Sequence, residues 1–237
     1  MSKHSPKKSS AGFSLIELLI AMTLTLTVMS IATVLLAQAL NVRTRTNANN
    51  DALADTQRAL NIMSREISEA GFNLSGNGIV AGDTGNDANG NSMIRIRSNL
   101  NRFDENAGAT ARNGIGVTGE DAGEDIKYFI HEAANTNLLA RFDEYGEDGG
   151  SVTVLANRLD SLHLHYYGGK VSYTTSGCDV TGASAAEVNP SAAQYVVIAV
   201  CVQLNAVGRF GTAGYQPAQS VLLVSDVTLR NANLPAY

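Results

Sequence analysis

The chain has 237 residues and a formal net charge of −5, which leaves room for one long helix and one globular domain of ordinary size. An acidic balance argues against a general phosphate-binding surface, so nucleic acid is not an expected partner. Only 16% of the residues are charged, below the roughly 25% of an average soluble protein. This composition favours a membrane segment followed by a loop-rich β domain.

The amino-terminal region combines a short basic leader with a long apolar run. Residues 1–12 carry Lys3, Lys7 and Lys8 and no acid, and the 23 residues 18–40 carry no charge. At about 1.5 Å per residue, a helix over this run is long enough to cross a hydrocarbon layer of roughly 30 Å. Lysines ahead of the run predict that the leader stays in the cytoplasm and that the rest of the chain lies across the membrane.

Glu17 is the acid at the start of this run. A lone charge inside a membrane costs roughly 2.5 to 3.5 kcal/mol on insertion scales, so Glu17 needs a partner or an interfacial position. A secretory signal peptide has a shorter apolar core and a small-residue cleavage site behind it, whereas the small-residue junction here, at Ala11 and Gly12, lies in front. A plain signal anchor explains the hydropathy but does not require Glu17.

One continuous helix is expected over residues 13–70, because no proline interrupts them, and its length would be about 87 Å. Its second half is amphipathic, with one apolar face formed by Leu53, Leu60, Met63 and Ile67. Gly71 supplies the left-handed residue expected just past a helix end. We expect residues 13–40 to pack in lipid or against copies of themselves, and the second half to lie on a sheet.

Residues 71–237 are expected to form a β-rich headgroup. Alternating or apolar segments predict strands at residues 93–97, 126–132, 138–142, 152–155, 159–167, 195–204 and 220–229. Residues 195–204 are the most continuously apolar and should form a central strand, while 152–155 should lead an edge. Because loops rather than helices connect the strands, the sheet should be mainly antiparallel and the fold class α+β.

Two histidines on one expected strand are candidate metal ligands. His163 and His165 are two residues apart and therefore face the same way. A metal site needs further ligands, and the other histidines are His131 and His4 of the leader. The favoured alternative is that this side of the strand is its solvent face.

A Gly-rich loop gathers oxygen atoms that are candidate calcium ligands. Its polar residues are Asp83, Asn86, Asp87, Asn89 and Asn91. Asp83 and Asp87 are the candidate carboxylates, but the EF-hand pattern with its closing bidentate Glu is not met. A second acidic loop at residues 143–148 has the same weakness. We therefore predict no metal and no cofactor.

Catalytic motifs receive little support. A formal G-x-G-x-x-G match at residues 114–119 lacks the preceding strand and following helix that a dinucleotide site requires. No serine lies in a nucleophile elbow, and neither cysteine has a histidine nearby in sequence. The chain is not expected to be an enzyme.

Cys178 and Cys201 are the whole thiol content of the chain. If the headgroup lies outside the cytoplasm, an oxidising compartment permits a disulfide between them. The closed loop would then be worth up to about 3 kcal/mol in the chain-entropy model. The alternative is two separate buried thiols, and both remain open because the sequence fixes no distance.

Residues 12–22, with the sequence GFSLIELLIAM, resemble the class III signal of type IV pilins and type II secretion pseudopilins. The resemblance implies that a prepilin peptidase cuts between Gly12 and Phe13 and methylates the new terminus at Phe13. Removing the leader's lysines would take the net charge from −5 to −8. The resemblance also implies that Glu17, the fifth mature residue, pairs with the terminal amine of Phe13 on a neighbouring subunit. Opposite charges relieve each other's desolvation in a low-dielectric bundle.

Residues 59–72, the strands around Phe129 and Leu139, residues 159–167 and residues 227–231 are similar to the minor pilins called PilW, of which pseudopilin J of type II secretion is a relative. This similarity implies a structural subunit that primes or caps a type IV pilus, together with prepilin peptidase, other minor and major pilins, and the inner-membrane assembly platform. The precursor would span the bacterial inner membrane with a periplasmic headgroup and later reach the pilus at the cell surface. A type II secretion pseudopilin and a calcium- or ligand-binding tip adhesin are the alternatives.

Overall fold

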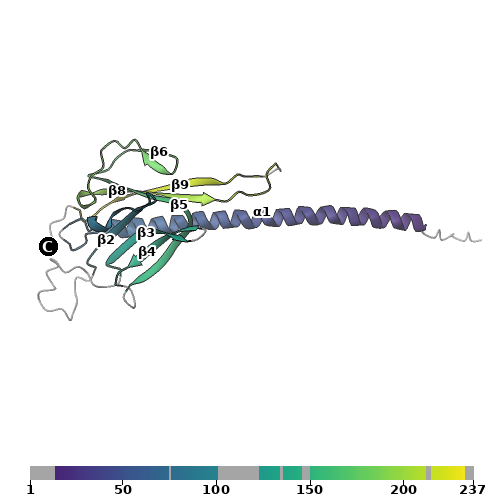
Figure 1. Ribbon diagram of the computed structural model, residues 1–237, viewed down its shortest axis with the longest axis horizontal. Helices are drawn as coiled ribbons and strands as arrows, with labels where there is room; N and C mark the ends of the chain where they lie inside the picture. Colours follow the sequence, from purple (N-terminus) through teal and green to yellow (C-terminus); the bar gives the residue numbers. More distant parts are fainter. Residues whose placement is uncertain are drawn as a thin grey trace, which may run out of the picture.

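The computed structural model describes residues 14–74, 76–100, 123–133, 136–145, 150–211 and 215–232. The predicted cleavage junction at Gly12 and Phe13 and the glycine pattern at residues 114–119 lie outside them. A single helix of 55 residues, α1 (Leu15–Glu69), extends from a β-rich headgroup (Figure 1). At 1.5 Å per residue α1 is about 83 Å long, so the prediction of one unbroken helix is confirmed.

The second half of α1 packs on the sheet along one face. The side chains buried there are those of Asn49, Ala52, Thr56, Ala59, Leu60, Met63 and Ile67. Leu53 is partly buried and packs against the same core, so all four residues of the predicted apolar face contact the core. Ala52 and Ala59 are almost completely buried between α1 and the sheet, and their small side chains let the helix and the sheet approach closely.

Gly71 ends the helix, as predicted. It has φ of +76°, and a Cβ atom there would lie 2.4 Å from the carbonyl oxygen of Gly76. The Gly71 N–H donates to the carbonyl oxygen of Arg97 at 2.9 Å. Only glycine fits this left-handed, crowded position, which turns the chain from α1 onto the sheet.

Seven strands form one antiparallel sheet in the order β1-β2-β3-β4-β5-β8-β9, and a separate hairpin pairs β6 with β7. The strands are β1 (Gly85–Asn86), β2 (Ser92–Arg97), β3 (Asp125–Ala133), β4 (Thr136–Asp143), β5 (Ser151–Tyr167), β6 (Thr174–Ser176), β7 (Asp179–Thr181), β8 (Tyr195–Leu204) and β9 (Gln219–Thr228). Single 3-10 turns occupy Ala81–Asp83 and Pro190–Ala192. The molecule is therefore α+β, with a long helix packed on a curled antiparallel sheet.

The strand β5 corrects one prediction. Residues 152–155 and 159–167 belong to one continuous strand of 17 residues, and the first of these segments is not an edge. The first part of β5 pairs with β4 and the second part with β8, with register shifts where the partner changes. Arg158 lies at this bend with φ of +59°, so a bulge replaces the expected break.

The strand β8 is central, as predicted, because it pairs with β5 on one side and β9 on the other. Its inner side chains join the core beneath α1. The opposite face carries a second apolar cluster, which is covered by the flap, defined as residues 168–194 between β5 and β8 and including the β6–β7 hairpin. The predicted solvent face of β5 is therefore partly covered near His165.

Candidate functional site

Residues 15–40 of α1 form an apolar surface that the headgroup does not cover. Their large apolar side chains are between 50% exposed at Leu19 and 78% exposed at Leu15. Within the part of the chain that the structure describes, α1 is the one helix long and apolar enough to cross a membrane by length and composition. Threonine hydroxyls in this half donate to carbonyl oxygens of the preceding turn, as Thr33 does to Met29 at 2.8 Å. Such bonding leaves the surface suited to lipid or to other helices.

Glu17 is the only charged residue between positions 14 and 42. Its carboxylate accepts a hydrogen bond of 3.2 Å from the backbone N–H of Ser14, so in the single chain it caps its own helix. The nearest cation along α1 is Arg43, about 39 Å away along the helix axis. If a bundle buries this surface, a compensating charge for Glu17 must come from the chain terminus or from another molecule.

A buried polar cluster fixes α1 against the sheet. Glu66 of α1 accepts hydrogen bonds from Tyr128 of β3 and from Arg141 of β4, where the distance to Arg141 Nε is 3.1 Å. Burial, followed by the neighbouring Glu66 carboxylate, raises the pKa of the Tyr128 phenol far above its ordinary value. Arg141 also lies 3.4 Å from Asp143. No local sequence pattern indicates this cluster, because Glu66 lies more than 60 residues before Tyr128 and Arg141.

The two calcium candidates have partners within the protein. The carboxylate of Asp83 lies 2.6 Å from Arg95 Nη1, and this hydrogen bond lowers the pKa of Asp83. Asp87 Oδ1 accepts from the backbone N–H groups of Asn89 at 2.9 Å and Asn91 at 2.8 Å. Among the described residues, neither acid belongs to a group of three converging metal-ligand atoms.

His165 attaches the flap to β5. Its Nδ1 lies 2.7 Å from Glu187 Oε1 and its Nε2 lies 2.7 Å from Asp179 Oδ1. Burial alone would lower the pKa of the imidazole, but the hydrogen bonds to Glu187 and Asp179 outweigh it and raise the pKa. A ring between two carboxylates donates from both nitrogens, which requires the imidazolium form. His165 therefore links β5 to the flap, and neither of its nitrogens is free to bind a metal.

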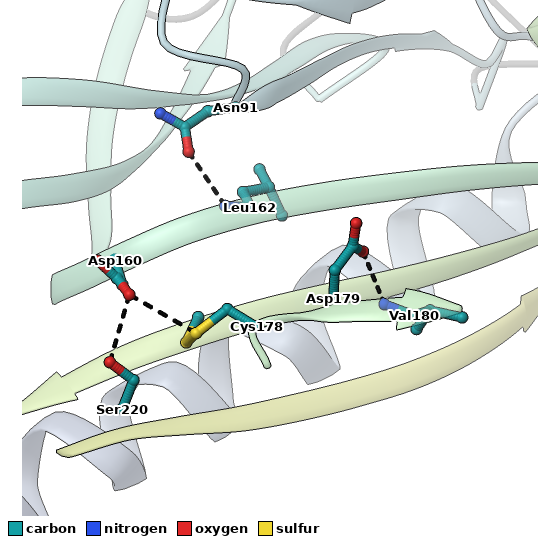
Figure 2. The surroundings of a disulfide bond; sticks show 8 residues. Asn91, Asp160, Leu162, Cys178, Asp179, Val180 and Ser220 are labelled. Atoms are coloured by element: carbon teal, nitrogen blue, oxygen red, sulfur yellow. Dashed lines mark hydrogen bonds between the residues drawn. A yellow bond between two sulfur atoms is a disulfide. The ribbon is translucent and has the colours of Figure 1, made fainter. Parts of the chain in front are cut away.

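A disulfide attaches the same flap to β8, an interior strand of the sheet. Cys178, between β6 and β7, is bonded to Cys201 of β8, with 5.3 Å between their Cα atoms. Figure 2 shows Asp160 beside this bond, with its carboxylate 3.3 Å from Ser220 Oγ. These two sulfurs and Asp160 are the one group of three potential metal ligands among the described residues. Because the sulfurs are bonded to each other, the group offers only a single carboxylate.

The geometry defines a membrane-capable apolar helix carrying one acid, attached to an α+β headgroup in a pilin-like arrangement. Residues 7–33 match the family described as the prokaryotic N-terminal methylation motif. A search of curated proteins gives no match. The motif supports a type IV pilin-like, structural protein that is anchored in a membrane, processed by prepilin peptidase and assembled with other pilins.

Proposed function

We propose that the chain is a minor pilin of the PilW kind, which primes or caps a type IV pilus. The observation that carries the proposal is the exposed apolar half of α1, whose single charged residue, Glu17, lies within the methylation motif. A surface of this kind cannot remain in water. It moves from lipid in the precursor to a bundle of similar helices in the filament.

Processing at Gly12 and methylation of Phe13 supply the charge that Glu17 lacks. The new terminus is a cation four residues before Glu17, and it is carried by every subunit. When the helices are staggered in a bundle, the amine of one subunit meets the carboxylate of the next. This pairing favours an ordered stagger, since a displaced helix leaves both charges buried without partners.

The same residue arguments fit a pseudopilin of type II secretion. We favour the minor pilin because residues 59–72 and 159–167 are similar to PilW. Co-purification distinguishes the two assemblies, since the chain should appear in sheared pili and not in secretion complexes. A calcium-binding tip adhesin receives no support from Asp83 or Asp87, whose carboxylates already bind Arg95 and backbone N–H groups.

The Glu17→Ala variant tests the charge pairing. Processing and headgroup folding should be intact, while the amount of the chain in purified filaments should fall. Asp55→Ala, which removes an exposed acid farther along α1, is the matched control and should assemble normally. Incorporation of Glu17→Ala at the wild-type level would refute the pairing.

The Gly12→Leu variant tests the cleavage site. A leucine before the junction should stop maturation, so the chain should accumulate at the precursor mass. A product of mature mass from this variant would show that cleavage occurs elsewhere.

A further inference from the structure

The hairpin between β8 and β9 continues past the sheet and lies along α1 in the direction of its apolar half (Figure 1). Asn49 Nδ2 of α1 donates to the carbonyl oxygen of Asn205 at 3.1 Å, and Arg45 Nη1 donates to the carbonyl oxygen of Ala206 at 3.3 Å. Val207 and Gln216 then pair across the hairpin. These contacts hold residues 205 and 206 of the hairpin beside residues 45–49 of α1.

This part of α1 lies at the boundary between the apolar and polar halves of the helix. One face of α1 between Leu35 and Asn47, together with Gly208 and Arg209 of the hairpin, lines a hollow of about 720 Å³. The uncharged run ends at Leu40, so by helix rise the hollow extends about 7 Å into the apolar side and about 10 Å into the polar side. In a membrane-spanning helix this is the position of the lipid headgroups.

The charge of the hollow is opposite to that of the whole chain. Its lining contains three arginines, Arg43, Arg45 and Arg209, and no acid, although the chain carries −5. All three arginines are exposed. Long arginine side chains at the end of an apolar helix reach lipid phosphates, which accept bidentate hydrogen bonds.

The tip of the hairpin adds aromatic surface at the same end. Phe210 is 83% exposed, and Tyr215 packs edge to face against it with 5.4 Å between ring centroids. An exposed phenylalanine beside arginines is unfavourable in water but suits the membrane–water interface, where aromatic rings concentrate.

We propose that Arg209, Phe210 and Tyr215 of the β8–β9 hairpin and the adjoining end of the apolar helix together form a docking surface for an anionic phospholipid headgroup. The arginines bind the lipid phosphate, and Phe210 inserts at the boundary between the lipid headgroups and the acyl chains. These contacts hold the β-rich domain of the protein in a fixed orientation on the membrane before the subunit is extracted. The occupant is lipid, because the surface is continuous with the segment that spans the bilayer. This inference rests on the membrane-anchored precursor of the proposed function.

The absence of tryptophan from the chain gives a direct test. The Phe210→Trp variant of the full chain is reconstituted into vesicles of phosphatidylcholine, with and without added phosphatidylglycerol, and tryptophan emission and quenching by brominated lipid are measured. We expect a blue-shifted, lipid-quenched signal that strengthens with the anionic lipid. Phe72→Trp, in a 40% exposed site beyond the far end of α1, is the matched control, and its emission should be neither quenched by brominated lipid nor changed by the anionic lipid.

The role of the arginines is tested on the same reporter. Replacing Arg43 and Arg209 by Gln should lower the ratio of docked to undocked tips by about five-fold per arginine in anionic vesicles. Replacing Arg58 and Arg65, two exposed arginines farther along α1, removes the same charge and should leave the ratio unchanged.

Three outcomes would overturn the proposal. Water-like emission at position 210 in every vesicle would exclude lipid docking, and a shift seen only in assembled filaments would assign the surface to a second subunit. Equal quenching with and without anionic lipid would show that the surface does not recognise an anionic lipid headgroup. Flotation of the wild-type chain with the vesicles tests separately whether the apolar half of α1 anchors the protein in a membrane. A failure of lipid binding at the hairpin is therefore distinguishable from a failure of the proposed function.

Discussion

Reduction of the bond between Cys178 and Cys201 should destabilise the headgroup by a predictable amount. The two cysteines are 23 residues apart in the chain, and closing a loop of this size is worth about 3 kcal/mol in the chain-entropy model. Cys201 of β8 is fully buried, so the bond attaches the flap to a strand that is paired on both sides within the sheet.

The assay is urea unfolding of the full chain in detergent, followed by near-ultraviolet circular dichroism of its eight tyrosines. With a urea dependence of about 2 kcal/mol per molar, the reduced protein should unfold about 1.5 M earlier than the oxidised protein. A Cys178→Ala/Cys201→Ala variant should resemble the reduced protein and should not respond to reductant.

An unchanged midpoint after complete reduction would refute this reasoning. A rise in amide exchange confined to β6 and β7, without a shift of the midpoint, would also contradict it. That result would mean that the flap opens by itself and that the loop closure does not contribute to the stability of the sheet.

Three other substitutions test the packing and charge arguments. Met63 is fully buried between α1 and the sheet, so Met63→Ala should lower the free energy of unfolding by about 3 kcal/mol in urea titration. A loss below about 1 kcal/mol would mean that the helix is not firmly packed on the sheet. Arg141→Ala leaves Glu66 without its cation and should cost about 1 to 3 kcal/mol in the same assay, whereas an unchanged midpoint would show that the pair is not stabilising. The pKa of His165 is raised above its ordinary 6.5, so its contribution to stability is complete below about pH 6.5 and is lost as the pH rises through the raised pKa. The wild-type melting temperature should therefore fall between about pH 6 and about pH 8 more than that of His165→Gln, with His163→Gln as the control; equal pH dependence in all three would contradict the link between β5 and the flap.

The helix and most strands are predictable from sequence because their signals are local. The uncharged run, the stripe ending at Ile67 and the glycine at position 71 are patterns within a few turns of one another. The strand at residues 195–204 is equally clear, since its apolar residues are nearly continuous. Leu162, Leu164 and Tyr166 alternate and face the core as predicted.

The remaining features depend on contacts between distant residues. Asn157, Arg158 and Asp160 have the composition of a loop, yet they continue β5 because β4 and β8 pair with its two ends. The predicted solvent face of β5 is partly covered at His165, because the flap supplies Glu187 and Asp179 from beyond the strand. No local pattern identifies such partners.

No local pattern in the sequence indicates the hollow between α1 and the β8–β9 hairpin. Arg43 and Arg45 are visible as the end of the apolar run, but Arg209 and Phe210 lie more than 160 residues later. Only the extension of the β8–β9 hairpin along α1 brings these residues to one level of the helix.

Mass spectrometry of the intact protein purified from its native membrane and filaments tests the central claim most directly. The account predicts a chain that begins at Phe13, carries one methyl group on that terminus, and retains the whole apolar segment through Leu40. A filament subunit that still carries residues 1–12, or a mature chain from which the apolar segment has been removed, would contradict it.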